Sequence, residues 1–405
     1  MAIIIFMNVP GHGHVNPTLP VVQELVRRGR RVIYYNSEEF RPQIERVGAE
    51  FRPYPSALPS QAEIAAAVSR NMARISLLLV EAAAQLTPFM LNELQYEQPG
   101  IVIYDSICVW GMQAARVLGL PSVSSITTFV TEGAEWTLPR RDLAHMLLGA
   151  APLMPRFFRA RRRLLRTYGK KSLPAVLFPA TGNLNIVFTS RQLQPPTSFI
   201  NDSFRFVGPA INAATRDGSF PFAQLDRRPV TYISLGTLHS ADTAFFRHCF
   251  QAFADHSGQF ILSAGKNTDI NTLLPIPPNF LVYPSVPQLE VLQHADLFIT
   301  HGGMNSVHEG LYFGVPQVVV PHQMEQLLNA LQVRASGAGV VLGDRYPYGR
   351  VTADELRGAA DHVLSDPRFK QAAQRASESL RQAGGYQRAA AEIVAFAECH
   401  AAPAL

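Results

Sequence analysis

The sequence predicts an α/β protein of two domains, and three observations support that fold class. Residues 2–35 and 296–329 each show the order strand, glycine-containing turn, helix, strand, which is the pattern of a βαβ unit in a parallel sheet. A stretch rich in Pro, Gly, Asp and Ala lies at 209–229 and has the composition of a linker. The chain has 405 residues and 47% hydrophobic composition, which is enough for two sizeable cores.

The charge of the chain gives little support for nucleic-acid binding. The net charge is +5, and much of the excess lies at 156–171, where six arginines and two lysines occur. We interpret this run as the solvated face of an amphipathic helix, with an anionic membrane surface as the second interpretation and nucleic acid as the last. We therefore assign this segment no chemistry and expect no nucleic-acid partner.

The cysteines and the apolar runs predict a cytoplasmic protein. Cys108, Cys249 and Cys399 are far apart and show no Cys-x-x-Cys spacing, which argues against a disulfide framework or a zinc site and suits a reducing compartment. The apolar run at 3–6 is too short for a signal peptide and lacks a basic lead, and no uncharged apolar stretch has the length of a membrane span. We expect a soluble protein without stable membrane insertion.

The N-terminal βαβ unit begins with a buried strand at 2–8 and contains a second strand at 31–35. Between them, Asn16 as N-cap and Pro17 at the first helical position predict the start of an amphipathic helix, and Gly29 predicts its end. The turn lacks the Gly-x-Gly-x-x-Gly pattern, and no acidic residue ends the second strand to hold a ribose. A nicotinamide-dependent dehydrogenase is therefore disfavoured.

Two histidines, His12 and His14, lie in the turn after the first strand. They can form a metal site, although no third ligand is obvious nearby, or a loop histidine can simply be satisfied by the backbone. The third interpretation is a general base. A histidine at the carboxyl end of a strand and close to a helix N-terminus feels a positive dipole that lowers its pKa, and a neutral imidazole can accept a proton from a hydroxyl. We favour the base.

The rest of the first domain is predicted to hold long helices over 61–96 and four strands, at 101–104, 121–126, 185–189 and 204–207. Asp105 directly follows one strand and Thr127 with Thr128 directly follow the next. Ligands bind open α/β sheets at the carboxyl ends of strands, so these side chains are candidates for a site. The rival interpretation of Asp105 is the N-cap of the next helix.

The second domain is predicted to begin with the strand 230–235, which leads into the turn Gly236-Thr237 and a helix over 243–253. Further parallel strands are expected at 259–264, 280–283, 296–300, 317–320 and 339–342. An alanine-rich helix is expected over 385–400.

The segment 296–329 carries the clearest chemistry. Its strand breaks at Gly302-Gly303, a helix follows from about Met304 to Phe313, and Gly314 ends it. Glycines let the backbone approach a ligand closely, and the N–H groups and dipole at a helix N-terminus bind anions, so we predict a phosphate site. The alternative is an ordinary turn that contains glycines.

Four side chains strengthen the interpretation of this segment as a ligand site. His301 precedes the turn, and Asn305 and Ser306 lie in the first helical turn, so all three can donate to phosphate oxygens. Glu309 lies one turn further along the same face, where a carboxylate suits the hydroxyls of a sugar.

The order of these residues resembles the donor-binding signature of family-1 nucleotide-sugar glycosyltransferases, most of all the bacterial macrolide and natural-product branch. The resemblance rests on Val286-Pro287-Gln288, His301-Gly302-Gly303-Met304-Asn305-Ser306, Glu309, Gly314-Val315-Pro316, Glu325-Gln326 and Asn329. It implies the GT-B fold, in which two Rossmann-like domains with parallel sheets face each other across a cleft. The implied divisions are an acceptor-binding domain at 1–208, a linker at 209–229, a nucleotide-sugar-binding domain at 230–384, and a helix at 385–405 that crosses back to the first domain.

The resemblance also selects the base. Gly13-His14-Val15-Asn16-Pro17 matches a pattern whose histidine is the general base of the family, which favours His14 over His12. Asp105 matches the aspartate that orients this histidine and stabilises its protonated form. Thr127 and Thr128 fall where the family often contacts the donor sugar or its phosphate.

The implied donor site lies on the second domain. The diphosphate is expected on Gly236, Thr237, His301, Gly303, Met304, Asn305 and Ser306, the ribose on Glu309, the base near Ser285, Val286 and Gln288, and the sugar on Glu325 and Gln326. Two positions depart from the family. Ser285 replaces a tryptophan that stacks on the base in many relatives, and His239 stands where relatives often carry an aromatic or small residue. Uracil is the expected base, with thymine nucleotides as the alternative.

These parts predict an inverting glycosyltransferase that moves a sugar, expected to be glucose, from a UDP-sugar to a hydroxyl of a hydrophobic small molecule such as a macrolide, polyketide or flavonoid. His14 would deprotonate the acceptor. No metal and no other cofactor are expected, because a helix dipole and donors would stabilise the leaving diphosphate, and the sequence has no Asp-x-Asp pair. The alternatives are a sugar-nucleotide epimerase of the same fold and a non-catalytic nucleotide-sugar-binding protein.

Overall fold

The computed structural model describes residues 3–55, 63, 72–131, 140–216, 218–236, 242–266 and 268–400. The chain divides into two compact units. The first comprises the chain up to Ala210 together with the residues from Ala383 onward, and the second comprises Ile211–Gln382.

The first unit contains a seven-stranded parallel sheet with the order β3-β2-β1-β4-β5-β6-β7. Its strands are β1 (Ile4–Met7), β2 (Val32–Asn36), β3 (Glu50–Pro53), β4 (Ile101–Asp105), β5 (Ser122–Ile126), β6 (Leu184–Val187) and β7 (Phe204–Phe206). Its helices are α1 (His12–Val15), α2 (Thr18–Arg27), α3 (Arg41–Arg46), α5 (Met72–Glu97), α6 (Val109–Leu118), α7 (Arg140–Ala150), α8 (Met154–Tyr168) and α15 (Gly385–His400), with one 3-10 turn at Glu38–Phe40.

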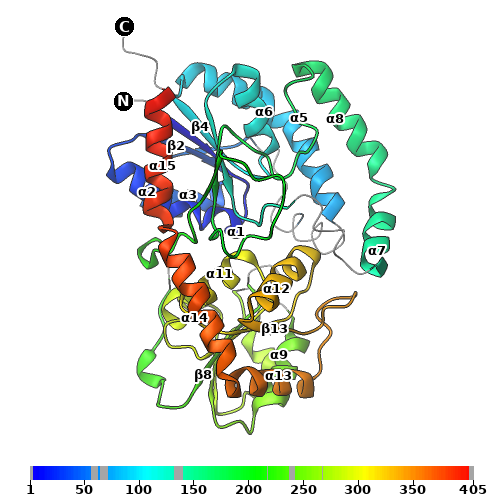
Figure 1. Ribbon diagram of the computed structural model, residues 1–405, viewed down its shortest axis with the longest axis vertical. Helices are drawn as coiled ribbons and strands as arrows, with labels where there is room; N and C mark the ends of the chain where they lie inside the picture. The colour runs from blue at the N-terminus through cyan, green and yellow to red at the C-terminus, as the bar shows by residue number, and fades with distance from the viewer. Residues whose placement is uncertain are drawn as a thin grey trace. The chain divides into compact units, whose positions relative to one another are not determined.

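Both faces of this sheet are covered, which explains why its central strands are continuous apolar runs. Alternate residues of a strand face opposite sides. Phe6 packs in a core with Leu19 of α2 and Ile393 of α15, whereas Met7 packs in a second core with Trp110 of α6. Figure 1 shows α2 and α15 on one side of the sheet and α5, α6 and α8 on the other.

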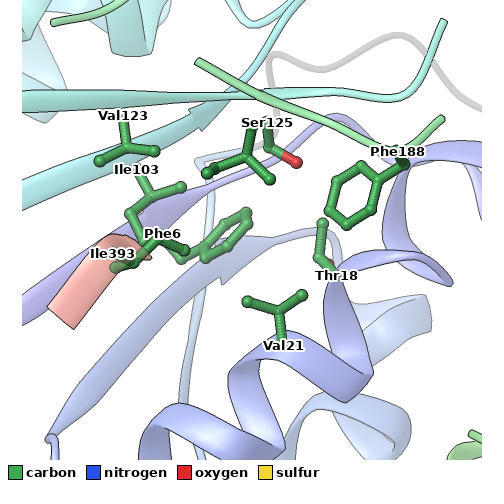
Figure 2. A pocket seen from close by; sticks show the side chains of 9 residues that line it. Phe6, Thr18, Val21, Ile103, Val123, Ser125, Phe188 and Ile393 are labelled. Carbon is green, nitrogen blue, oxygen red and sulfur yellow. The ribbon is translucent and has the colours of Figure 1, made fainter. Parts of the chain in front are cut away.

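A small void lies in the first of these cores (Figure 2). Its volume is about 10 Å³, which is room for one water molecule at most and too little for a sugar or an acceptor. Most of its lining is apolar, with hydroxyls only from Thr18 and Ser125. We therefore look for the functional site at the edge of the sheet and not in this void.

The start of the first helix differs from the prediction. Asn16 is not an N-cap; it follows a short helix, α1, whose N-cap is Gly11, and Pro17 takes the N-cap position of α2. The Thr18 hydroxyl donates to the backbone oxygen of Val15, which links the start of α2 to the end of α1. Local Asn-Pro preferences were overridden by this packing at the sheet edge.

Two helices bear on the membrane question. In α8, Arg159, Arg162, Arg163 and Arg166 are exposed while Leu164 is buried, as expected for a solvated amphipathic face. One helix, Ala73–Glu97 of α5, is long and apolar enough to cross a membrane by length and composition alone. Of its most apolar part, 44% is buried inside the protein, and the helix packs against α6 and α8.

The second unit contains a six-stranded parallel sheet with the order β10-β9-β8-β11-β12-β13. Its strands are β8 (Val230–Ser234), β9 (Gln259–Ser263), β10 (Phe280–Tyr283), β11 (Leu297–Thr300), β12 (Gln317–Val319) and β13 (Gly339–Val341). Its helices are α9 (Thr243–Phe253), α10 (Gln288–Val291), α11 (Met304–Tyr312), α12 (Met324–Ser336), α13 (Ala353–Ser365) and α14 (Pro367–Gln382), with 3-10 turns at Ala213–Thr215, Phe222–Gln224 and Ile270–Leu273. All six strands lie where the apolar runs predicted them, within one residue.

The segment predicted as a linker, 209–229, belongs to the second unit from Ile211 onward. Phe220 is buried in a core of the second unit together with Val230 and Val286. At the other end of the chain, α15 packs against α2 of the first unit, and Arg205 Nε lies 3.1 Å from Glu392 Oε2.

Candidate active site

Each sheet has one point at which its strand order reverses. In the first unit this point lies between β1 and β4, and in the second it lies between β8 and β11. The loops that leave these neighbouring strands run in opposite directions, so a crevice opens at the carboxyl ends of the strands, and ligands of open α/β sheets bind there. The predicted site residues concentrate at these two places.

At the reversal in the first unit, the structure brings His14 to Asp105. His14 Nδ1 lies 2.8 Å from Asp105 Oδ2, although 91 residues separate them. The Asp105 side chain is fully buried, whereas that of His14 is 24% exposed. The other carboxylate oxygen of Asp105 accepts from the backbone N–H of Ile107, and α6 has Cys108 and not Asp105 as its N-cap. Asp105 therefore orients the histidine and does not cap the helix.

This contact favours one tautomer of His14. A carboxylate next to Nδ1 favours the proton on that nitrogen, which leaves the lone pair on Nε2. The Thr127 hydroxyl oxygen also lies 3.0 Å from Nδ1, and Asn8 Nδ2 donates to the backbone oxygen of His14. Thr127, predicted as a contact of the donor sugar, thus lies against the histidine ring. Thr128 is the next residue and is partly exposed.

The helix-dipole effect expected for His14 stays a prediction. His14 lies in the last turn of α1, a helix of four residues, and α2 begins only at Thr18. The structure shows Asp105 and Thr127 in contact with the Nδ1 atom of the His14 ring. His12 points elsewhere, with its ring in an edge contact 5.1 Å from the ring centroid of Phe40.

At the strand reversal of the second unit, the candidate site is formed mainly by backbone groups, in contrast to the side chains at the first reversal. Gly303 is the N-cap of α11 and has no side chain to cap it, so the first N–H groups of this nine-residue helix point out of its N-terminus. Gly302 has φ +90°, and a Cβ there would lie 2.9 Å from the backbone oxygen of Gln326. The chain can make this turn only with glycine.

His301 is held between the two loops of this reversal. A Cβ on Gly236 would lie 2.5 Å from His301 Cε1, and a Cβ on Gly303 would lie 2.5 Å from His301 Nε2. The imidazole therefore rests directly on both backbones, and it is buried. This arrangement brings together three of the predicted diphosphate residues.

The remaining predicted phosphate residues continue along α11. Met304 and Ser306 are buried and Asn305 is partly exposed in the first turn. The opening turn is braced from α12, because Asn329 Nδ2 donates to the backbone oxygen of Gly302 at 2.9 Å. Thr237 and His239, from the loop after β8, lie outside the described residues.

The two residues predicted to bind the sugar have different environments. Glu325 is partly exposed, and its Oε1 accepts from Asn329 Nδ2 at 2.7 Å. Gln326 is buried, and its side-chain oxygen accepts from the backbone N–H of His322 at 2.9 Å. The carboxamide oxygen of Gln326 thus shapes the loop before α12.

The predicted ribose and base residues meet around Glu309. Gln288 Nε2 donates to Glu309 Oε2 at 2.6 Å, and the Tyr232 hydroxyl donates to Gln288 Oε1 at 3.1 Å. Burial raises the pKa of Tyr232, which keeps its hydroxyl a donor. Near the expected base, Ser285 is exposed and Val286 is buried.

Arg216 also contacts Glu309, and its sequence position did not predict this role. Its Nη2 lies 2.5 Å from Glu309 Oε1. Arg216 lies in the segment predicted as a linker, 93 residues from its partner. The only signal in the sequence was a positive charge next to the start of the second domain. Within the described ranges, no group of three or more His, Cys, Asp or Glu side chains could hold a metal ion.

Comparison with known proteins decides the family. Residues 250–395 match the family described as Erythromycin biosynthesis protein CIII-like, C-terminal domain. The chain is 36% identical to the NDP-glycosyltransferase YjiC of Bacillus subtilis (strain 168), over 99% of this chain and 98% of that protein. The chain belongs to the bacterial family-1 natural-product glycosyltransferases.

Other relatives of this glycosyltransferase agree. It is 31% identical to the demethyllactenocin mycarosyltransferase of Streptomyces fradiae, over 95% of this chain and 84% of that protein. The crystal structure of CalG4, the calicheamicin glycosyltransferase, has a TM-score of 0.81 at 28% identity, over 99% of this chain and 100% of that chain. The glycosyltransferase therefore has the GT-B fold, with one parallel-sheet domain in each unit.

Proposed function

We propose that this glycosyltransferase moves a sugar, glucose as the first candidate, from a UDP-sugar to a hydroxyl of a hydrophobic small molecule, with inversion at the anomeric carbon. The observation that carries this proposal is the His14 to Asp105 contact of 2.8 Å at the carboxyl edge of the first sheet. A base held in this way has no use in a protein that only binds nucleotide sugars.

The proposed reaction is a single displacement at the anomeric carbon. His14 Nε2 takes the proton of the acceptor hydroxyl while the oxygen attacks the anomeric carbon. The bond from that carbon to the diphosphate oxygen breaks, and the electron pair leaves with the nucleoside diphosphate. Attack from the face opposite the leaving group inverts the centre, so an α-linked donor gives a β-glycoside. Asp105 stabilises the imidazolium that forms.

The leaving group is proposed to lie at the N-terminus of α11. The unpaired N–H groups after Gly303, the helix dipole and donors from Asn305 and Ser306 would stabilise its growing negative charge. We propose that no metal ion and no other cofactor take part. Glu309 and Gln288 would bind the ribose and the nearby edge of the base, with Glu325 on the sugar.

The acceptor is proposed to be a macrolide, a polyketide or a flavonoid. Two relatives support a natural-product acceptor by their names, a demethyllactenocin mycarosyltransferase and an oleandomycin glycosyltransferase. We place the reaction in the cytoplasm, because Cys108 and Cys249 are buried free thiols, as suits a reducing compartment.

Product analysis tests the proposal. The enzyme is incubated with UDP-glucose and a panel of phenolic and macrolide alcohols, and the products are analysed by mass spectrometry. We expect an acceptor that gains the mass of one hexosyl group, and an anomeric configuration opposite to that of the donor by NMR. A changed sugar nucleotide without any acceptor product would instead identify an epimerase, and binding without turnover would identify a sensor.

A further inference from the structure

The carboxylate of Glu309 is held from both sides. Oε1 lies 2.5 Å from Arg216 Nη2, and Oε2 accepts from Gln288 Nε2 at 2.6 Å. The Glu309 side chain is 3% exposed and that of Arg216 is 22% exposed. A buried carboxylate needs a compensating cation, so removal of Arg216 leaves a buried charge with only a neutral amide beside it.

The two contacts also fix the direction of the carboxylate. Each ionised oxygen can accept more than one hydrogen bond, so the lone pairs that Arg216 and Gln288 do not use can accept from a diol. With a donor on each oxygen, the plane of the carboxylate cannot rotate without breaking a charge-assisted hydrogen bond. An orientation fixed before binding reduces the entropy that a ligand must supply.

The segment that carries Arg216 is itself anchored. The Asn212 side chain accepts from the backbone N–H of Ala214, and the Thr215 hydroxyl donates to the backbone oxygen of Asn212 at 2.8 Å. Just after Arg216, a Cβ added to Gly218 would lie 3.0 Å from the backbone nitrogen of Pro287. The segment therefore packs against the loop that carries Gln288, and Arg216 approaches Glu309 from a fixed position.

We propose that Arg216 is a positioning residue for the donor nucleotide: it orients Glu309 toward the ribose, so that the preference for a ribonucleoside over a 2′-deoxyribonucleoside diphosphate depends on it. This rests on the proposed function, in which Glu309 binds the ribose of a UDP-sugar. Arg216 acts through Glu309 and need not touch the ligand.

Calorimetry with UDP and 2′-deoxy-UDP tests the proposal on the full chain. We expect the wild type to bind UDP roughly tenfold more tightly than 2′-deoxy-UDP, the scale of one hydrogen bond to a charged group. Arg216→Gln should weaken UDP binding by roughly tenfold and 2′-deoxy-UDP binding much less, which brings the ratio close to one. Arg216→Lys should keep part of the preference, because it restores the charge without the guanidinium geometry.

Arg228→Gln is the matched control. Arg228 pairs with Asp226 in the same segment of the chain but away from Glu309, so this variant should keep both affinities. In steady-state assays Arg216→Gln should raise KM for the donor, with kcat and KM for the acceptor close to those of the wild type. Thermal melting of each variant records whether the fold is intact.

The outcomes separate the two proposals. A wild type that binds neither nucleotide, or both equally, overturns the assignment of the ribose to Glu309 and with it this inference. If the wild type prefers UDP and Arg216→Gln keeps that preference, the inference is overturned and the proposed function stands. If Arg216→Gln loses both nucleotides equally and melts at a lower temperature, Arg216 has a structural role only, which also overturns the inference.

Discussion

The two strand reversals of this glycosyltransferase occupy the same place in their sheets, but one presents side chains and the other presents backbone groups. Between β1 and β4 the chain presents side chains, His14 backed by Asp105. Between β8 and β11 it presents backbone, the turn at Gly302 and Gly303 with the N-terminus of α11 behind it. Moving a proton needs a titratable atom with a defined lone pair, whereas holding a diphosphate needs several fixed donors. In the proposed function, one topology therefore serves two kinds of chemistry.

This comparison predicts different sensitivities. At the first reversal, activity should be lost when a side chain changes its chemistry with its shape retained. At the second reversal, donor binding should weaken when a side chain is added where there was none.

Replacement of His14 should have the largest effect. His14→Ala should lower the rate of transfer to an alcohol by about 10² to 10⁴, the usual range for a lost general base, and leave UDP affinity nearly unchanged. Asp105→Asn should lower it less, because the imidazole remains but loses its charged partner. Steady-state kinetics and calorimetry measure the two effects.

Two comparisons check the assignment of the base. A thiol acceptor that is already ionised near neutral pH needs no base and should lose much less rate in His14→Ala. His12→Ala should transfer to alcohols at close to the wild-type rate. If His12→Ala alone abolishes transfer while its fold is intact, the wrong histidine has been chosen.

The next prediction concerns a histidine that must stay uncharged in the folded protein. His308 in α11 is fully buried, and burial lowers its pKa to about 4, while its Nδ1 lies 2.9 Å from the backbone oxygen of Met304. Below pH 6.5 the unfolded chain binds a proton on His308, whereas the folded chain leaves this side chain neutral. The free energy of unfolding therefore decreases as the pH falls from 6.5 towards 4. The full loss is about 3 kcal/mol.

Urea unfolding at pH 7 and pH 5 measures this effect. The wild type should lose stability between the two, with about 2 kcal/mol of the loss due to His308. His308→Asn places an amide donor where Nδ1 lies, for the Met304 oxygen, and removes the titration, so its stability should change less over the same interval. An equal change in both proteins would show that His308 is not the group responsible.

Addition of a methyl group at the second site should weaken donor binding. In Gly303→Ala the new carbon would lie 2.5 Å from His301 Nε2, and overpacking of this kind costs about 1 to 3 kcal/mol. UDP affinity measured by calorimetry should fall by roughly 10-fold to 100-fold. Gly358→Ala, in α13 of the same unit and with nothing within 4 Å of the added carbon, should leave UDP affinity unchanged.

The smallest expected effect is that of metal removal. Because backbone N–H groups and a helix dipole are proposed to stabilise the leaving diphosphate, activity should be largely retained in EDTA. Initial rates with and without the chelator measure this. A loss of turnover that Mg²⁺ restores would mean that charge stabilisation at the second site needs a cation.

Local signals explain which predictions from the sequence agree with the structure. The strands were predictable because a parallel strand buried on both faces is a continuous apolar run, and the turn at Gly302 because its backbone conformation excludes other residues. The pairing of His14 with Asp105 came from a family resemblance and not from the residues themselves. The helix start at Asn16 was wrong because the packing of Thr18 against the end of α1 outweighs the Asn-Pro preference.

The sequence by itself determined the two βαβ units, the glycine turn before α11 and the residue types that face each sheet edge. Only the tertiary structure decided that Thr127 lies against His14, that Gln326 is buried, and that Arg216 reaches Glu309. Strand periodicity and glycine conformation are fixed by neighbours a few residues away, so they can be seen in the sequence. A contact between residues 93 positions apart exists only once the sheet and its loops are packed, because nothing local to Arg216 specifies which carboxylate it meets.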